Sequence, residues 1–74
     1  MLKDIKVGDI VVLEDGTERT VDEVRTDKPF GPNWDADVWL SFDPRTKLGG
    51  HFLWDGTNTY TGPKCKNIIE IKVR

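Results

Sequence analysis

The sequence contains one clear β-hairpin, Lys6-Val-Gly-Asp-Ile-Val-Val-Leu-Glu-Asp-Gly-Thr-Glu-Arg-Thr-Val-Asp-Glu-Val24, to which the rest of the chain adds further strand candidates. Residues 10–13 are aliphatic and mostly β-branched, and such residues favour a pleated, half-buried strand. Asp15-Gly16 follows them and predicts a tight turn, because glycine adopts positive φ without a steric penalty. The return strand does not alternate strictly, so we expect a bulge or an early strand end near Asp22 and Glu23.

Residues 36–42 supply a strand in the middle of the chain. Alternation there predicts a core-facing side made of Ala36, Val38, Leu40 and Phe42. Trp39 then lies on the opposite face, where two interpretations stay open. A large aromatic side chain between polar neighbours is typical of an interface, whereas packing across the sheet against Trp54 or Tyr60 is the alternative.

Two more strand candidates, residues 51–54 and 57–60, flank a second tight turn at Asp55-Gly56. The last candidate, residues 67–74, alternates again; its predicted inward side chains are Ile69, Ile71 and Val73, with Ile68 on the outer side. A terminal strand left unpaired exposes backbone groups, so we expect it to pair with the opening hairpin and help close a barrel. The sequence thus predicts an all-β fold, a single small barrel of about five antiparallel strands.

A resemblance to known folds makes this predicted barrel more specific, namely a single small SH3-like barrel. A Val7-Gly8-Asp9 opening, an apolar strand, an Asp-Gly turn and a returning strand are similar to the first hairpin of SH3-like small barrels, including the KOW-type domains. The remainder, with Trp39, Trp54-Asp55-Gly56, a tyrosine and a closing Ile-Ile-Glu-Ile strand, resembles the layout of small uncharacterised bacteriophage-encoded proteins. The first resemblance implies ribosome or polymerase partners, and the second implies an accessory or host-directed role in the host cytoplasm. Neither assigns functional residues to this chain.

Length and composition fit one small globular domain, residues 1–74, with a thin core. The chain has 11 basic and 13 acidic side chains, so it lacks the basic excess that is typical of nucleic-acid-binding proteins. No apolar run approaches the ~20 residues of a membrane span, and the lone Cys65 cannot form a disulfide within one chain. We expect a cytoplasmic protein without membrane association, either a monomer or a small homo-oligomer.

The sequence offers little catalytic or metal-binding chemistry, and we expect no catalytic residues, no metal and no cofactor. His51 is the only histidine and lies in a strand candidate, where a structural role is the commoner one. Cys65 lies between two lysines that favour its thiolate, yet no partner base is visible. Asp35, Asp37 and Asp43 cluster around one strand, but their spacing matches no calcium loop.

We expect a non-enzymatic protein-interaction module that binds its partner through an aromatic surface patch of Phe30, Trp34, Trp39, Trp54 and Tyr60. For Phe30 and Trp34, which belong to a long loop containing proline and glycine, plugging one end of a barrel is the alternative. A second hypothesis is a small-molecule or nucleotide binder, in which the aromatic rings stack a base and Arg45 or Lys47 contacts phosphates. A third is single-stranded nucleic-acid binding by stacking, against which the isoelectric point of 5.2 argues.

Overall fold

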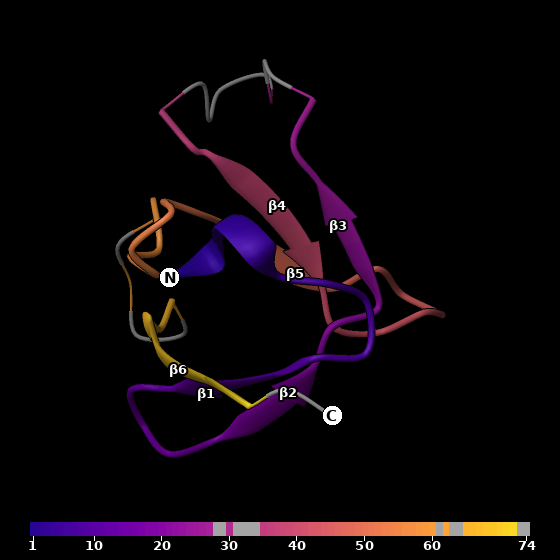
Figure 1. Cartoon of the computed structure of the whole chain (residues 1–74), viewed down its shortest axis with the longest axis horizontal. Coiled ribbons are helices and arrows are strands. Elements are labelled where there is room, and N and C mark those ends of the chain that lie inside the picture. The colour runs from indigo at the N-terminus through magenta and orange to yellow at the C-terminus, as the bar shows by residue number, and fades with distance from the viewer. Residues whose placement is uncertain (28–29, 31–34, 61, 63–64, 73–74) are drawn as a thin grey trace.

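The computed structural model describes residues 1–27, 30, 35–60, 62 and 65–72. One turn of 3-10 helix, η1 (Leu2–Asp4), precedes six strands: β1 (Ile10–Leu13), β2 (Glu18–Thr20), β3 (Glu23–Arg25), β4 (Val38–Ser41), β5 (Gly49–Phe52) and β6 (Ile68–Lys72). They form two antiparallel three-stranded sheets, sheet A with the order β2-β1-β6 and sheet B with the order β3-β4-β5. Sheet B lies above sheet A in Figure 1, with η1 between them. Among these residues, no helix is long and apolar enough to cross a membrane.

The all-β class is confirmed, but the prediction of about five strands in a closed barrel is wrong for the described residues, whose six strands pair as two open sheets. One reason is that the predicted return strand of the hairpin is divided. The Val21 N–H donates to the Asp9 carbonyl of the first hairpin, whereas the Asp22 N–H donates to the Ser41 carbonyl of β4. The chain therefore passes from sheet A to sheet B at the strand end that the sequence predicted. A second difference is that residues 57–60 form no strand and contribute only an isolated bridge between Asn58 and Phe52.

The two predicted Asp-Gly turns are confirmed, and they have the same geometry. In the first, the Gly16 N–H donates to the Leu13 carbonyl over 2.8 Å, and the Leu13 N–H donates to the Thr17 carbonyl over 2.8 Å. The turn at residues 53–57 repeats both bonds at 2.9 and 2.8 Å. The glycine φ angles are +88° and +95°. This combination is typical of a hairpin loop in which glycine forms a bulge after a type I turn.

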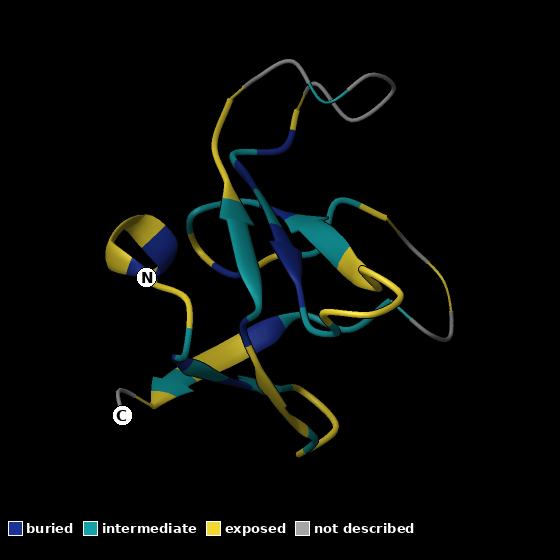
Figure 2. Ribbon diagram, turned by 90° about the vertical axis from the view of Figure 1, so that its right-hand side faces the viewer, coloured by how far each residue is buried: buried dark blue, intermediate teal, exposed yellow. Residues whose placement is uncertain are grey.

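The core takes side chains from η1, both sheets and the links between them: Leu2, Ile5, Val11, Val21, Val38, Leu40, Phe52 and Ile68. The predicted inward face of the middle strand is confirmed, since Ala36, Val38 and Leu40 are fully buried and Phe42 packs against the core. Figure 2 shows this buried strand at the centre of sheet B. Its burial leaves the alternate side chain, Trp39, on the outer face of the sheet.

Strand β6 pairs with β1, as the sequence predicted, but the expected facing is wrong for its first two residues. Ile68 is 2% exposed and lies in the core, whereas Ile69 is 55% exposed. The register between β1 and β6 shifts between Val12 and Leu13, because β6 contributes one residue more than β1 at that point. An inserted residue reverses the facing of every side chain beyond it. Ile71 still packs against the core, and Val73 lies outside the described residues.

Candidate functional site

Four ring-bearing side chains gather on the outer face of sheet B, and we call them the outer aromatic face: Phe30, Trp39, His51 and Tyr60. Trp39 and His51 are directly opposite each other in the β4–β5 pair, and side chains in that relationship have Cβ atoms about 4.5–5.5 Å apart. The His51 ring centroid lies 5.3 Å from that of Phe30 and 6.3 Å from that of Tyr60, both in edge-on arrangements. His51 is therefore the centre of the group.

A charged side chain borders the outer aromatic face at Trp39. Arg25 in β3 is the register partner of Trp39, and its guanidinium carbon lies 5.7 Å from the centroid of the Trp39 ring. Glu23 accepts a 2.7 Å hydrogen bond from the Arg25 Nε and so holds the guanidinium in place. Cation–π attraction is stronger for a positioned cation over tryptophan than over smaller rings. The tryptophan and the arginine thus form one arranged unit.

Lys47 extends this chain of charges away from the aromatic rings. Its Nζ lies 2.9 Å from an Asp22 oxygen and 3.2 Å from a Glu23 oxygen. Hydrogen bonds from Arg25 and then from Lys47 lower the pKa of the Glu23 carboxyl, so Glu23 stays ionised and keeps both cations in position. Lys47 is accordingly engaged by carboxylates, and Arg45 lies exposed in the turn between β4 and β5. The structure brings neither side chain into a ring contact among the described residues.

His51 is half-buried, and this burial lowers its pKa. Desolvation disfavours the imidazolium form, so the ring at the centre of the outer aromatic face is neutral at pH 7. A neutral imidazole among three aromatic rings presents a surface that is largely apolar. Arg25, which is paired with Glu23, borders this surface at Trp39.

Trp54, which was also predicted for the aromatic patch, lies elsewhere. Trp54 follows β5 and packs against the hydrophobic core. Its N–H donates to an Asp37 carboxylate oxygen over 2.9 Å and its carbonyl accepts from the Leu2 N–H over 2.8 Å, which fastens η1 to sheet B. No ring contact among the described residues joins Trp54 to the outer aromatic face. Trp34 is outside the described residues.

Two of the three acidic residues considered as metal ligands, Asp37 and Asp43, accept hydrogen bonds from nearby backbone groups. Asp37 accepts the Trp54 N–H, and Asp43 Oδ1 accepts the N–H groups of Arg45 and Thr46 over 2.8 and 3.3 Å. Within the described ranges, no group of three histidine, cysteine, aspartate or glutamate side chains is placed to hold a metal ion.

Sequence reasoning missed His51 and Arg25 as members of the site. His51 alternates with the buried Phe52, which indicates that His51 faces outward. The face on which His51 lies could therefore be predicted from the sequence. Its position opposite Trp39 depends on the register of β4 against β5, which no local pattern specifies.

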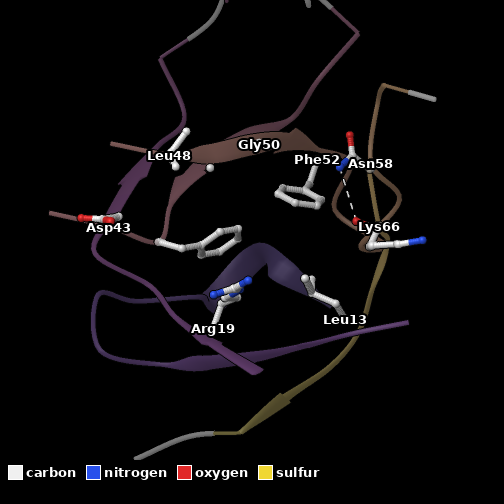
Figure 3. Close-up of a pocket in the computed structure, with 10 residues that line it drawn as sticks. Leu13, Arg19, Asp43, Leu48, Gly50, Phe52, Asn58 and Lys66 are labelled. Carbon is white, nitrogen blue, oxygen red and sulfur yellow. Dashed lines mark hydrogen bonds between the residues drawn. The ribbon is translucent and has the colours of Figure 1, made fainter. Parts of the chain in front are cut away.

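A second feature, missed in the sequence, is a groove of about 460 Å³ between the two sheets. Its walls are apolar side chains from both sheets and from the turn before β5, namely Leu13, Phe42, Leu48 and Phe52 (Figure 3). Arg19, Asp43, Asn58 and Lys66 border it. The groove therefore joins an apolar interior to a polar rim.

Comparisons with known proteins add no relative to this description. No protein-family model matches the sequence, and neither a curated protein nor a solved structure gives a significant match.

Proposed function

We propose that this protein is a non-enzymatic, SH3-like interaction module that binds a protein partner through the outer aromatic face. The observation that carries the proposal is the Trp39–His51 register pair, with Phe30 and Tyr60 edge-on to the histidine ring and Arg25 over the tryptophan. Tryptophan, tyrosine and arginine are the residue types that supply most binding energy at protein interfaces. Here they lie on one face of one sheet.

The arrangement suits an extended partner segment. Trp39 and His51 are fixed by neighbouring strands, and Arg25 is fixed by Glu23, so binding immobilises few additional rotatable bonds on this side. Aromatic platforms of this kind accept polyproline-type segments, which are already ordered before they bind. We therefore expect an extended, proline-containing segment as the ligand.

The cellular context of the proposal rests on the resemblance in layout to small phage-encoded proteins. That resemblance makes a host-cell protein the first partner to test and the host cytoplasm the first place to look. A ribosome or polymerase component is the alternative that the KOW-like hairpin suggests.

The test compares capture of host proteins by the wild-type chain with capture by Trp39→Ala and Tyr60→Ala, quantified by mass spectrometry. Ile69→Ala is the matched control, because Ile69 is an exposed apolar side chain on sheet A. Each variant is first checked for a dispersed amide NMR spectrum. We expect a partner that the wild type and Ile69→Ala retain equally and that both aromatic variants lose by tenfold or more, about 1.4 kcal/mol.

A partner lost equally with Ile69→Ala would count against the outer aromatic face as the binding surface. Retention by folded Trp39→Ala and Tyr60→Ala would do the same. Salt dependence is the further check, because contacts with a nucleic-acid backbone weaken steeply as salt rises whereas contacts between aromatic rings and a peptide do not.

A further inference from the structure

The groove between the sheets has walls that a ligand can contact on more than one side. Phe42 follows β4 and Phe52 ends β5, and their ring centroids are 6.3 Å apart with the planes tilted by 58°. Figure 3 shows the Phe52 ring on the sheet B side of the groove, with Leu13 and Arg19 across from it on the sheet A side. An apolar group entering the groove therefore contacts both sheets.

The groove exists because a core-facing position carries no side chain. Gly50 is the register partner of Leu40, which is fully buried, so position 50 faces inward. A Cβ atom there would come within 3.1 Å of the Phe52 ring, and any longer side chain would extend into the space between the sheets. Glycine at this position leaves that space open.

Arg19 is the cation that faces the groove. It is the register partner of the buried Val11, which places its side chain on the inner side of sheet A. Its neighbour Glu18 faces the other way and pairs with Lys72 over 2.8 Å. The Arg19 side chain is exposed and makes no hydrogen bond or ion pair with another residue that the structure describes. An arginine that faces an apolar groove is thus left without a carboxylate partner among these residues.

The other charges at the rim do not compensate Arg19. Asp43 forms no ion pair with it, and its carboxylate accepts hydrogen bonds from the turn that follows. Figure 3 shows the Lys66 ammonium directed away from the groove, while the Lys66 carbonyl accepts a 3.3 Å bond from Asn58 Nδ2. Among the described residues, no carboxylate is therefore paired with the Arg19 side chain.

We propose that this groove binds a small organic acid with an apolar body, which lies against Phe42, Phe52 and Leu13 while its carboxylate pairs with Arg19. A volume of about 460 Å³ is within the range of small-molecule sites. The planar guanidinium matches the two oxygens of a carboxylate, and such charge-assisted pairs are stronger than neutral hydrogen bonds. The site is separate from the outer aromatic face, so it does not depend on the function proposed above.

The test is an amide NMR titration of the full chain with 4-phenylbutanoate and, in parallel, with 4-phenylbutan-1-ol. The two probes share the apolar body and differ in the carboxylate. We expect the acid to bind at least fivefold more tightly than the alcohol, with the largest shifts at Leu13, Phe42 and Phe52. Arg19→Gln should weaken the acid at least fivefold and leave the alcohol unchanged. The matched control Arg45→Gln removes an exposed arginine in a turn and should leave both affinities as in the wild type.

Equal affinities for acid and alcohol would overturn the proposal, as would equal weakening by Arg19→Gln and Arg45→Gln. Shifts confined to His51, Trp39 and Tyr60 would move the ligand to the outer aromatic face and would overturn it too. A third probe is the tripeptide Ala-Gly-Phe with a free carboxylate. Binding of this peptide without binding of 4-phenylbutanoate would make the groove a receptor for a protein C-terminus instead of a small acid.

Discussion

The side-chain oxygen of Asn67 accepts a 2.8 Å hydrogen bond from the backbone N–H of Asn58. Asn67 also exchanges bonds with Glu14, whose N–H donates to the Asn67 carbonyl and whose carboxylate accepts the Asn67 N–H, both over 2.9 Å. Glu14 belongs to the first Asp-Gly turn, and Asn58 follows the second. One asparagine therefore connects the turn of sheet A to the turn of sheet B.

Replacing this asparagine should destabilise the fold. Asn67→Ala leaves the partly buried N–H of Asn58 without its acceptor, and an unsatisfied group of this kind costs about 1–3 kcal/mol. Urea denaturation measures the loss. Thr26→Ala, at an exposed position outside the strands, is the control and should change stability by less than about 0.5 kcal/mol. Equal effects of the two substitutions would show that the link between the turns contributes nothing.

Neighbouring isoleucines in β6 give a sharp test of the shifted register. Ile68→Ala removes a buried core side chain and should cost about 2–5 kcal/mol. Ile69→Ala removes a side chain that is 55% exposed, and we expect a loss below about 1 kcal/mol. The denaturation midpoints of the two variants, compared with that of the wild type, measure these losses. Strict alternation without the bulge predicts the reverse order, so a larger loss for Ile69→Ala would refute the register.

The glycines of the two Asp-Gly turns should differ in their tolerance of alanine although their φ angles are alike. At Gly16 the space around an added Cβ is open, so alanine meets only the left-handed backbone conformation, which costs about 1–2 kcal/mol. At Gly56 an added Cβ would overlap the carbonyl oxygen of Ile68. We expect Gly56→Ala to lower the free energy of unfolding by a further ~1–3 kcal/mol, because the added methyl group overpacks this site. Thermal melting of both variants measures the difference, and equal losses would contradict the close approach of β6 to this turn.

As the pH falls, protonation of His51 should lower the free energy of unfolding before protonation of the carboxylates does. Burial lowers the His51 pKa in the folded protein below its ordinary value of about 6.5, so protonation favours the unfolded state. Above about pH 6.5 the histidine is mostly neutral in both states, and the free energy of unfolding is at its full value. As the pH falls below about 6.5, the unfolded state takes up the proton more readily, and the free energy of unfolding decreases. Asp15, Asp43 and Asp55 have pKa values lowered by hydrogen bonds from their own turns, and their contributions are lost only below about pH 4.

Urea midpoints between pH 7.5 and 5 measure the histidine contribution. The urea midpoint of the wild type should fall as the pH decreases across this range. The midpoint of His51→Gln should stay nearly constant, because this variant has no titrating group at the centre of the outer aromatic face. The same downward slope in both proteins would assign the effect to another residue.

The parts of this fold that the sequence predicts are the local ones. Leu-x-Asp-Gly-Thr occurs at residues 13–17 and at 53–57, and each copy forms the same turn because every bond in it joins residues within five positions of each other. Alternation in residues 36–42 likewise identified which side chains enter the core. These features depend on neighbours along the chain, and those neighbours are visible in the sequence.

The parts that the sequence does not predict depend on register. Whether Ile68 or Ile69 enters the core is decided where β6 meets Val12 and Leu13, residues far away in the sequence. The gathering of His51 with Trp39 depends in the same way on how β5 is aligned with β4. The role of Gly50 in leaving a groove open likewise follows only from its position opposite the buried Leu40.

The pairing of β1 with β6 also has a consequence for synthesis on the ribosome. Val11 emerges before its strand partner Ile71, so the inner face of β1 stays uncovered while the residues between them are translated. The first hairpin can form early because its contacts are local, but the shared core cannot be completed before Ile68 has left the exit tunnel. Until β6 joins β1, the inner face of this aliphatic strand is therefore open to contact with other chains.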